Sequence, residues 1–166
     1  RYLDDVFSGN LTTMASNRRN IFEAVRRAEL VIGAVLLPGA KAPTLVTEEM
    51  IEAMAPGSVV LDVAVDQGGC IATAHPTSHS QPTYLLHDII HYAVPNIPGA
   101  VPRTATYALS NATLPYIREL AGKGLKDAVK SDPTLARGVN TYQGQITYGA
   151  VAAAFGHGHT PIERLL

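Results

Sequence analysis

The chain has 166 residues, of which 46% are hydrophobic and 16% charged, and its formal net charge is −1. This length allows one domain with a substantial core, with or without an appended segment, and the composition excludes a disordered chain. The near-neutral charge excludes the basic surface expected of a protein that binds nucleic acid.

No apolar run reaches the roughly 20 residues that a membrane span requires. Pro38, Lys41 and Asp62 interrupt the two best runs, and the first five residues lack the apolar core of a secretion signal. The single cysteine, Cys70, cannot form an internal disulfide, which suits a reducing compartment. We therefore expect a cytoplasmic protein without a membrane partner.

Strand and helix signals alternate in the first half of the chain. Residues 10–15 form a short β-like run, and the pair Ser16-Asn17 can cap a helix in which apolar residues recur at helical spacing. The apolar run 29–37 predicts a buried strand, and Thr47 can cap a second helix that ends near Pro56. With the strand that follows, this order predicts right-handed crossovers in a parallel sheet.

The most informative stretch is residues 57–70, which read GSVVLDVAVDQGGC. Its apolar run predicts a strand buried on both faces, as in a parallel sheet, that ends at Asp66. Ligands of such sheets bind beyond the carboxyl ends of the strands, so Asp66 is the leading candidate for a catalytic acid. The alternative for Asp66 is a turn-capping role. Gly68 and Gly69 permit a sharp turn or close approach to a ligand, and Asp62 is expected to bond neighbouring loops as a structural carboxylate.

No element is predicted within residues 71–88, which are rich in proline and histidine. The next apolar run, residues 89–94, predicts a further strand that ends before Asn96. Parallel strands have their carboxyl ends at one edge, so we expect Leu36, Asp66 and Asn96 to lie side by side there. The alternative for Asn96 is a side-chain hydrogen bond that supports its own loop.

From Thr104 onward the sequence is rich in alanine and leucine and predicts helices. Pro115 is expected to lie at a kink or in a first turn, residues 122–124 to stop the helix, and residues 147–155 to form a last short helix. The predicted fold class is therefore α/β, with a partial doubly wound (Rossmann) parallel sheet followed by a helical carboxyl-terminal segment.

The histidines suggest a metal site that the sequence does not complete. His75 and His79 are four residues apart, as are His87 and His91, and two ligands at this spacing share one face of a helix. Prolines make a helix doubtful at the first pair, and His91 falls in a predicted strand. No cysteine or glutamate stands at ligand spacing, so we expect no metal.

The glycine fingerprint of dinucleotide-binding folds, Gly-x-Gly-x-x-Gly between a strand and a helix, does not occur in this sequence. Two alternatives follow from this observation. Either the protein binds no dinucleotide, or the chain is the carboxyl-terminal part of a protein that does.

Several long segments, in this order, resemble the alanine dehydrogenase family, which is related to the α subunit of the proton-translocating transhydrogenase. The segments are LVIGAVLLPGAKAP at 30–43, VAVDQGGC at 63–70, NIPGAVPRT at 96–104, SNATLPY at 110–116 and GVNTY at 138–142. The resemblance thus covers nearly the whole chain. Two further segments, HPT at 75–77 and QPTY at 81–84, favour the dehydrogenase branch.

The resemblance implies reversible, NAD-dependent oxidative deamination of L-alanine to pyruvate and ammonium by a homo-oligomer, a hexamer in this family. It implies that Asp66 and Asn96 are catalytic residues near the nicotinamide. The implied cofactor-binding positions are Ser16, Val35, Leu36, Val63, Ala64, Val65, Asp66, His75, Val94, Pro95, Asn96 and Ile97. Because an aspartate in water is a poor proton donor at neutral pH, donation by Asp66 would require burial.

The resemblance also divides the chain. Residues 1–102 would form the carboxyl-terminal part of an NAD-binding domain, and residues 103–166 a helical segment that packs on a substrate domain. The family's substrate-binding arginine and lysine, its catalytic histidine and its glycine fingerprint belong to an amino-terminal region with no counterpart in this sequence. We expect the carboxyl-terminal portion of such an enzyme. The alternatives are a non-catalytic nucleotide-binding or interaction module and a histidine-based metal protein.

Overall fold

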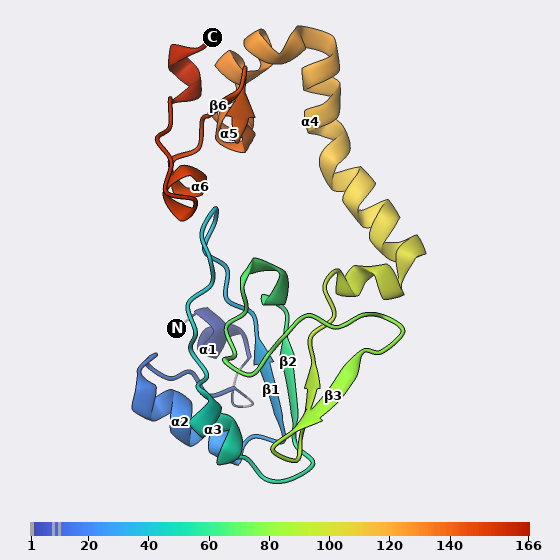
Figure 1. Cartoon of the computed structure of the whole chain (residues 1–166). Helices are drawn as coiled ribbons and strands as arrows, with labels where there is room; N and C mark the ends of the chain where they lie inside the picture. The colour runs from blue at the N-terminus through green and yellow to red at the C-terminus, as the bar shows by residue number, and fades with distance from the viewer. Residues whose placement is uncertain (1, 8, 10) are drawn as a thin grey trace. The chain divides into compact units, whose positions relative to one another are not determined.

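A computed structural model describes residues 2–7, 9 and 11–166, which form two compact units (Figure 1). The first unit holds the residues up to Val35 together with Ala42–Pro95, and the second holds Leu36–Lys41 together with Asn96–Leu166. The functional division into residues 1–102 and 103–166 remains a prediction.

The first unit is built on a four-stranded sheet with the order β1-β2-β4-β3. Strands β1 and β2 pair in parallel, as do β2 and β4, whereas β3 runs antiparallel to β4. The strands are β1 (Leu30–Gly33), β2 (Val59–Asp62), β3 (Thr83–Leu86) and β4 (Ile89–Tyr92). The predicted α/β class with a parallel sheet is confirmed, and β3 is an element that the sequence did not predict.

The helices of the first unit are α1 (Tyr2–Val6), α2 (Arg18–Arg27) and α3 (Glu48–Glu52). The predicted cap at Ser16-Asn17 is confirmed at Asn17, whose side-chain oxygen accepts the backbone N–H of Asn20 at 2.9 Å. Thr47 occupies the cap position of α3 without a side-chain cap bond. The β-like run predicted over 10–15 is wrong for residues 11–15, which pair with no strand among the described residues, and Asn10 lies outside them.

Among the described residues of the first unit, the buried core lies on one face of the sheet. Val25 of α2 and Met50 of α3 pack in one buried cluster with Val60 and Ile89 of the sheet. The other face carries apolar side chains that are 37–65% exposed: Leu30, Ile32, Leu85 and Ile90. The prediction that the strands are buried on both faces is therefore wrong for this structure, because α2 and α3 pack on the same side.

Strand β2 is shorter than predicted and ends at Asp62. Residues Val65–Gln67 form a 3-10 turn, η1, that contains Asp66. The prediction that the strand ends at Asp66 is therefore wrong. The physical reason is that the Asp62 carboxylate binds the backbone N–H groups that follow it, which closes a loop in place of further strand.

The second unit contains the long helix α4 and several short elements. Pro102–Ser131 form α4, whose dihedral angles leave the helical region only at Gly124, with φ of 73° and ψ of 165°. Gly124 thus divides α4 into two helical segments, which confirms the predicted helix stop. The first segment continues through Pro115 without a break. The remaining elements are η2 (Ile97–Ala100), α5 (Pro133–Gly138), β5 (Thr141–Tyr142), β6 (Gln145–Ile146), α6 (Gly149–Ala154) and η3 (Ile162–Arg164).

The predicted last helix over 147–155 is confirmed by α6, which occupies most of that range. Gly39, in the part of this unit that comes from residues 36–41, lies against α6, because a Cβ at Gly39 would come within 2.5 Å of Tyr148. Among the described residues, no helix is long and apolar enough to cross a membrane.

Candidate functional site

The carboxylate of Asp62 organises the loop beyond β2. Its side chain is 1% exposed, and Oδ2 accepts the backbone N–H groups of Cys70 at 2.8 Å and Ile71 at 3.0 Å. Oδ1 accepts the N–H of Ala64 at 2.9 Å. Hydrogen bonds from three amides compensate the desolvation of a buried carboxylate. The structural role predicted for Asp62 is confirmed by these bonds, which hold residues 63–70 as a defined loop.

Two glycines let this loop return to Asp62. Gly68 and Gly69 both have positive φ, 97° and 73°, a region that side chains with a Cβ rarely adopt. A Cβ at Gly69 would lie 3.1 Å from Oδ2 of Asp62. The sharp turn predicted for the glycine pair is confirmed, and the close approach that it permits here is to the Asp62 carboxylate.

Asp66 projects from this loop at the carboxyl end of β2, and its side chain is exposed. An exposed carboxylate can accept hydrogen bonds from an ammonium group or from water. Its exposed position therefore suits a role in orienting a ligand or water.

A pocket of about 450 Å³ lies beside the carboxyl end of β1. Its size falls within the roughly 300–1,000 Å³ typical of small-molecule sites. Its lining is largely apolar and includes Ser16, Ile21, Val25, Ile32, Val35 and Cys70. Two of the predicted cofactor positions, Ser16 and Val35, thus line one pocket.

Cys70 is a buried thiol in the wall of this pocket and lies 3.6 Å from Oδ1 of Asp62. Burial raises the pKa of the Cys70 thiol above its usual value, and the neighbouring Asp62 charge raises it further. Because the thiolate is the reactive species, this thiol is a poor nucleophile. Cys70 acts as a packed side chain.

Tyr84 on β3 holds His75, another predicted cofactor position. Its hydroxyl donates to the carbonyl of Thr73 at 2.8 Å and accepts the backbone N–H of His75 at 3.1 Å. Its ring stacks on His75 and on His91, with centroid distances of 3.9 Å and 4.9 Å. His75 and Tyr84 line a second pocket of about 440 Å³.

His91 on β4 is 1% exposed and is held in one tautomer. Its Nδ1 lies 2.9 Å from the carbonyl oxygen of Ile89, which can only accept, so Nδ1 carries the proton. Its Nε2 then accepts the hydroxyl of Thr73 at 2.8 Å. Burial lowers the pKa of His91 below its ordinary value, so the ring stays neutral.

Asn96 belongs to the second unit and begins η2 in a left-handed conformation, with φ of 55° and ψ of 52°. Asparagine tolerates this region better than most residues. Its carbonyl accepts the N–H of Gly99 at 2.8 Å. Asn96 lines a pocket of about 590 Å³ with Pro98, Pro102 and Leu109 of the same unit.

The predicted cofactor positions thus fall in both units and in several settings. Leu36, Asn96 and Ile97 belong to the second unit, and the other positions belong to the first. Three of these residues, Ala64, Val65 and Val94, are 6% exposed or less. Their side chains are buried, so a ligand can meet these residues only at their backbone groups. That all these positions form one cofactor site remains a prediction.

One cluster of candidate ligands was missed by sequence reasoning. Glu48, Glu52 and His87 each bring one possible ligand atom within 4.8 Å of the other two. The only local signal was the spacing of the two glutamates, four apart on a predicted helix. The histidine that joins them comes from 39 residues beyond Glu48.

Comparison with known proteins identifies close relatives. The chain matches the family model described as "Alanine dehydrogenase/PNT, C-terminal domain" over residues 1–149. The alanine dehydrogenase of Methanococcus maripaludis is 55% identical over 166 residues, and that of Bacillus subtilis is 53% identical over 167. The alignments cover 99% and 100% of this chain but 44% of each relative. The chain therefore spans less than half the length of these relatives.

Solved structures give a consistent result. An L-alanine dehydrogenase matches with a TM-score of 0.80 and 51% sequence identity, over 93% of this chain and 43% of that one. A transhydrogenase from Sinorhizobium meliloti matches with a TM-score of 0.50 and 32% identity, over 54% of this chain and 25% of that one. The dehydrogenase is thus matched over more of the chain than the transhydrogenase.

Proposed function

The chain belongs to the alanine dehydrogenase/PNT C-terminal domain family, and from this membership we propose that the protein carrying it oxidises L-alanine to pyruvate and ammonium with NAD, reversibly. The observation that carries the proposal is the loop of residues 63–70, which Asp62 holds at the carboxyl end of β2 with Asp66 exposed. Ligands of parallel sheets bind at this end. Because the chain covers 44% of the length of its Methanococcus maripaludis relative, the activity is proposed for the whole protein and not for this chain alone.

The apolar pocket beside β1 supports NAD as the cofactor. A flat aromatic ring buries apolar surface well, and the same wall contains the polar residue Ser16. We assign Ser16 and Val35 to this contact, and Leu36, Asn96 and Ile97 to the cofactor site as the resemblance implies.

The proposed net reaction converts L-alanine, NAD⁺ and water into pyruvate, NADH, ammonium and a proton. NAD supplies the acceptor for the hydride that leaves the α carbon. The residues of this chain would orient the reactants: the Asp66 carboxylate accepts a hydrogen bond from the substrate amine or from the water that replaces it. Asp62 acts indirectly, because it holds the backbone of the loop that carries Asp66.

The resemblance further supports a cytoplasmic homo-oligomer, which we propose to be a hexamer. Light scattering coupled to size-exclusion chromatography measures the mass of the assembled protein directly. A monomer under the conditions of full activity would contradict this part of the proposal and would leave the proposed reaction untouched.

Asp66→Asn in the complete protein tests the proposal. The amide keeps the shape of the side chain but removes its charge, so turnover with L-alanine and NAD should fall far more than the affinity for NADH. Steady-state kinetics and NADH fluorescence titration measure the two quantities. Unchanged turnover would remove Asp66 from the mechanism.

Asp62→Asn is the matched control, since it makes the same change four residues earlier. It should lower the free energy of unfolding by about 1–3 kcal/mol, because the new side-chain NH₂ group cannot accept the backbone N–H groups that Asp62 binds. Asp66→Asn should leave stability nearly unchanged, because its side chain is exposed. A wild-type protein that binds NADH but forms none from L-alanine would instead support the non-catalytic nucleotide-binding alternative.

A further inference from the structure

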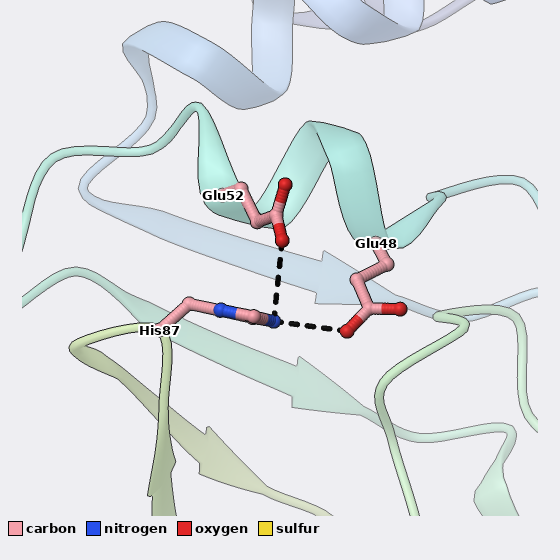
Figure 2. A group of neighbouring side chains, drawn as sticks. All are labelled: Glu48, Glu52 and His87. Carbon is pink, nitrogen blue, oxygen red and sulfur yellow. Dashed lines mark hydrogen bonds and ion pairs between the residues drawn. The ribbon is translucent and has the colours of Figure 1, made fainter.

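Three side chains converge beside the start of β4, at the opposite end of the sheet from Asp66. Figure 2 shows Glu48 and Glu52 on α3 pointing toward His87 in the turn between β3 and β4. The Nε2 atom of His87 lies 2.9 Å from Oε1 of Glu48 and 3.6 Å from Oε1 of Glu52. None of the three residues is part of the proposed NAD or alanine site.

The local structure accounts for this convergence. Glu48 and Glu52 are four residues apart on α3, which places them on one face of the helix. His87 and Asp88 form a tight turn between two antiparallel strands, and both have positive φ, 53° and 60°, as such turns commonly require. The pairing of β3 with β4 therefore fixes where the imidazole stands relative to α3.

The charges of the cluster are unbalanced without a cation. Two carboxylates face one imidazole nitrogen, and that nitrogen carries at most one proton to share between them. The third glutamate of the helix, Glu49, differs because it has an arginine partner, Arg18, at 2.9 Å. A divalent cation placed among the three ligand atoms would bond all of them and remove the repulsion between the carboxylates.

We propose that Glu48, Glu52 and His87 form a Zn²⁺ site. Zinc bonds imidazole nitrogen and carboxylate oxygen at about 2.0–2.2 Å with tetrahedral geometry, which places ligand atoms about 3.3 Å apart. The distances from Nε2 to the two glutamate oxygens, 2.9 Å and 3.6 Å, bracket that value. All three ligand atoms lie within 4.8 Å of one another, so the ion would draw the two glutamate oxygens closer together.

The donor set selects zinc over the hard cations. Magnesium prefers six oxygen ligands in octahedral geometry and gives up water reluctantly, whereas imidazole favours zinc. Three protein ligands leave the fourth zinc position to water. Because the ligands come from α3 and from the β3–β4 turn, the bound ion would tie the helix to the hairpin.

Zinc titration of the metal-free full chain tests the proposal. Equilibrium dialysis should find one equivalent of zinc bound to the wild type. The affinity for zinc should be lower by about ten-fold or more in His87→Ala and in Glu52→Gln. Glu49→Gln, on the same helix, should keep the wild-type affinity. Because the chain contains five other histidines, the difference between wild type and variants identifies the site.

Thermal unfolding supplies a second readout that does not depend on enzymatic activity. Zinc should raise the midpoint of the wild type and of Glu49→Gln but not that of His87→Ala, and magnesium should have no effect. Equal zinc affinity in wild type and His87→Ala, no stoichiometric zinc in the wild type, or equal stabilisation by magnesium would each overturn the proposal. Circular dichroism of the metal-free variants establishes whether they are folded. If His87→Ala does not fold, Glu52→Gln replaces it as the test variant.

Discussion

Two aspartates four residues apart have opposite environments in this protein. Asp62 is buried and accepts three backbone amides, whereas Asp66 is exposed on the loop that those bonds hold. The apolar run from Val59 to Val65 did not reveal where the strand ends, because hydrophobicity continues past the last ladder bond. The carboxylate of Asp62 ends the strand by binding the amides that follow.

His91 should make stability fall in mild acid. Burial lowers its pKa below the ordinary 6.5, and the nearby His75 and His87 lower it further. Between the lowered pKa and 6.5 the unfolded chain binds more protons than the folded one, so stability rises with pH there. As pH falls below about 6.5, the contribution of this one group should decrease the unfolding free energy by up to about 1.4 kcal/mol per pH unit.

Urea unfolding of the full chain at a series of pH values from neutral to mildly acidic measures this dependence. His91→Gln provides the control, because glutamine can bond Thr73 or the Ile89 carbonyl without titrating. Its stability should change less with pH than that of the wild type, whatever its absolute stability. Identical pH slopes for the two proteins would show that His91 is not responsible.

At the level of elements, β1 and the loop beyond β2 are joined by close packing. Gly33, the last residue of β1, lies opposite Asp62 in the parallel register. A Cβ at Gly33 would lie 2.4 Å from Sγ of Cys70 and 3.3 Å from the side chain of Ile71. Glycine is therefore required here for space, since its φ is not positive.

Gly33→Ala should lower the free energy of unfolding by about 1–3 kcal/mol, the usual cost of overpacking a buried site. Cys70→Ala removes the sulfur that the new methyl group would strike. In a double-mutant cycle measured by denaturant unfolding, Gly33→Ala should cost less in the Cys70→Ala background than in the wild type. Additive costs would show that the clash with Sγ is not the cause.

The elements that were predicted correctly are each marked by local features of the sequence. The Asn17 cap, the helix stop at Gly124 and the last short helix are each determined within a few residues. The missed element, β3, is a four-residue run, Thr83–Leu86, whose sole partner among the described residues is β4, across a two-residue turn. The segment 11–15 had a strand-like composition but gains no partner among the described residues.

For the molecule as a whole, the sheet face that the described residues of the first unit leave exposed is a candidate surface for association. Leu30, Ile32 and Leu85 are 53%, 59% and 65% exposed on that face. Contiguous exposed apolar surface commonly drives association. The 166-residue chain expressed alone should therefore self-associate in a concentration-dependent way, which light scattering measures as a rise in mass.

Leu85→Lys should reduce that association, since it places a charge on the uncovered face. Ser80→Lys adds the same charge at an exposed position in the loop before β3 and serves as the control. If both variants associate as strongly as the wild type, the sheet face is not the contact surface. If both associate less, net charge rather than the face is responsible.

The sequence alone determined the α/β class, the family and most of the order of strands and helices, because caps, turn residues, hydrophobic period and segment resemblance are all read over short stretches of chain. The tertiary structure decided which other parts of the chain those stretches contact. It ended β2 at Asp62, left one face of the sheet uncovered by the described residues of the first unit, and brought His87 to Glu48 and Glu52. These outcomes depend on contacts between residues far apart in the chain, and local patterns carry no information about such contacts.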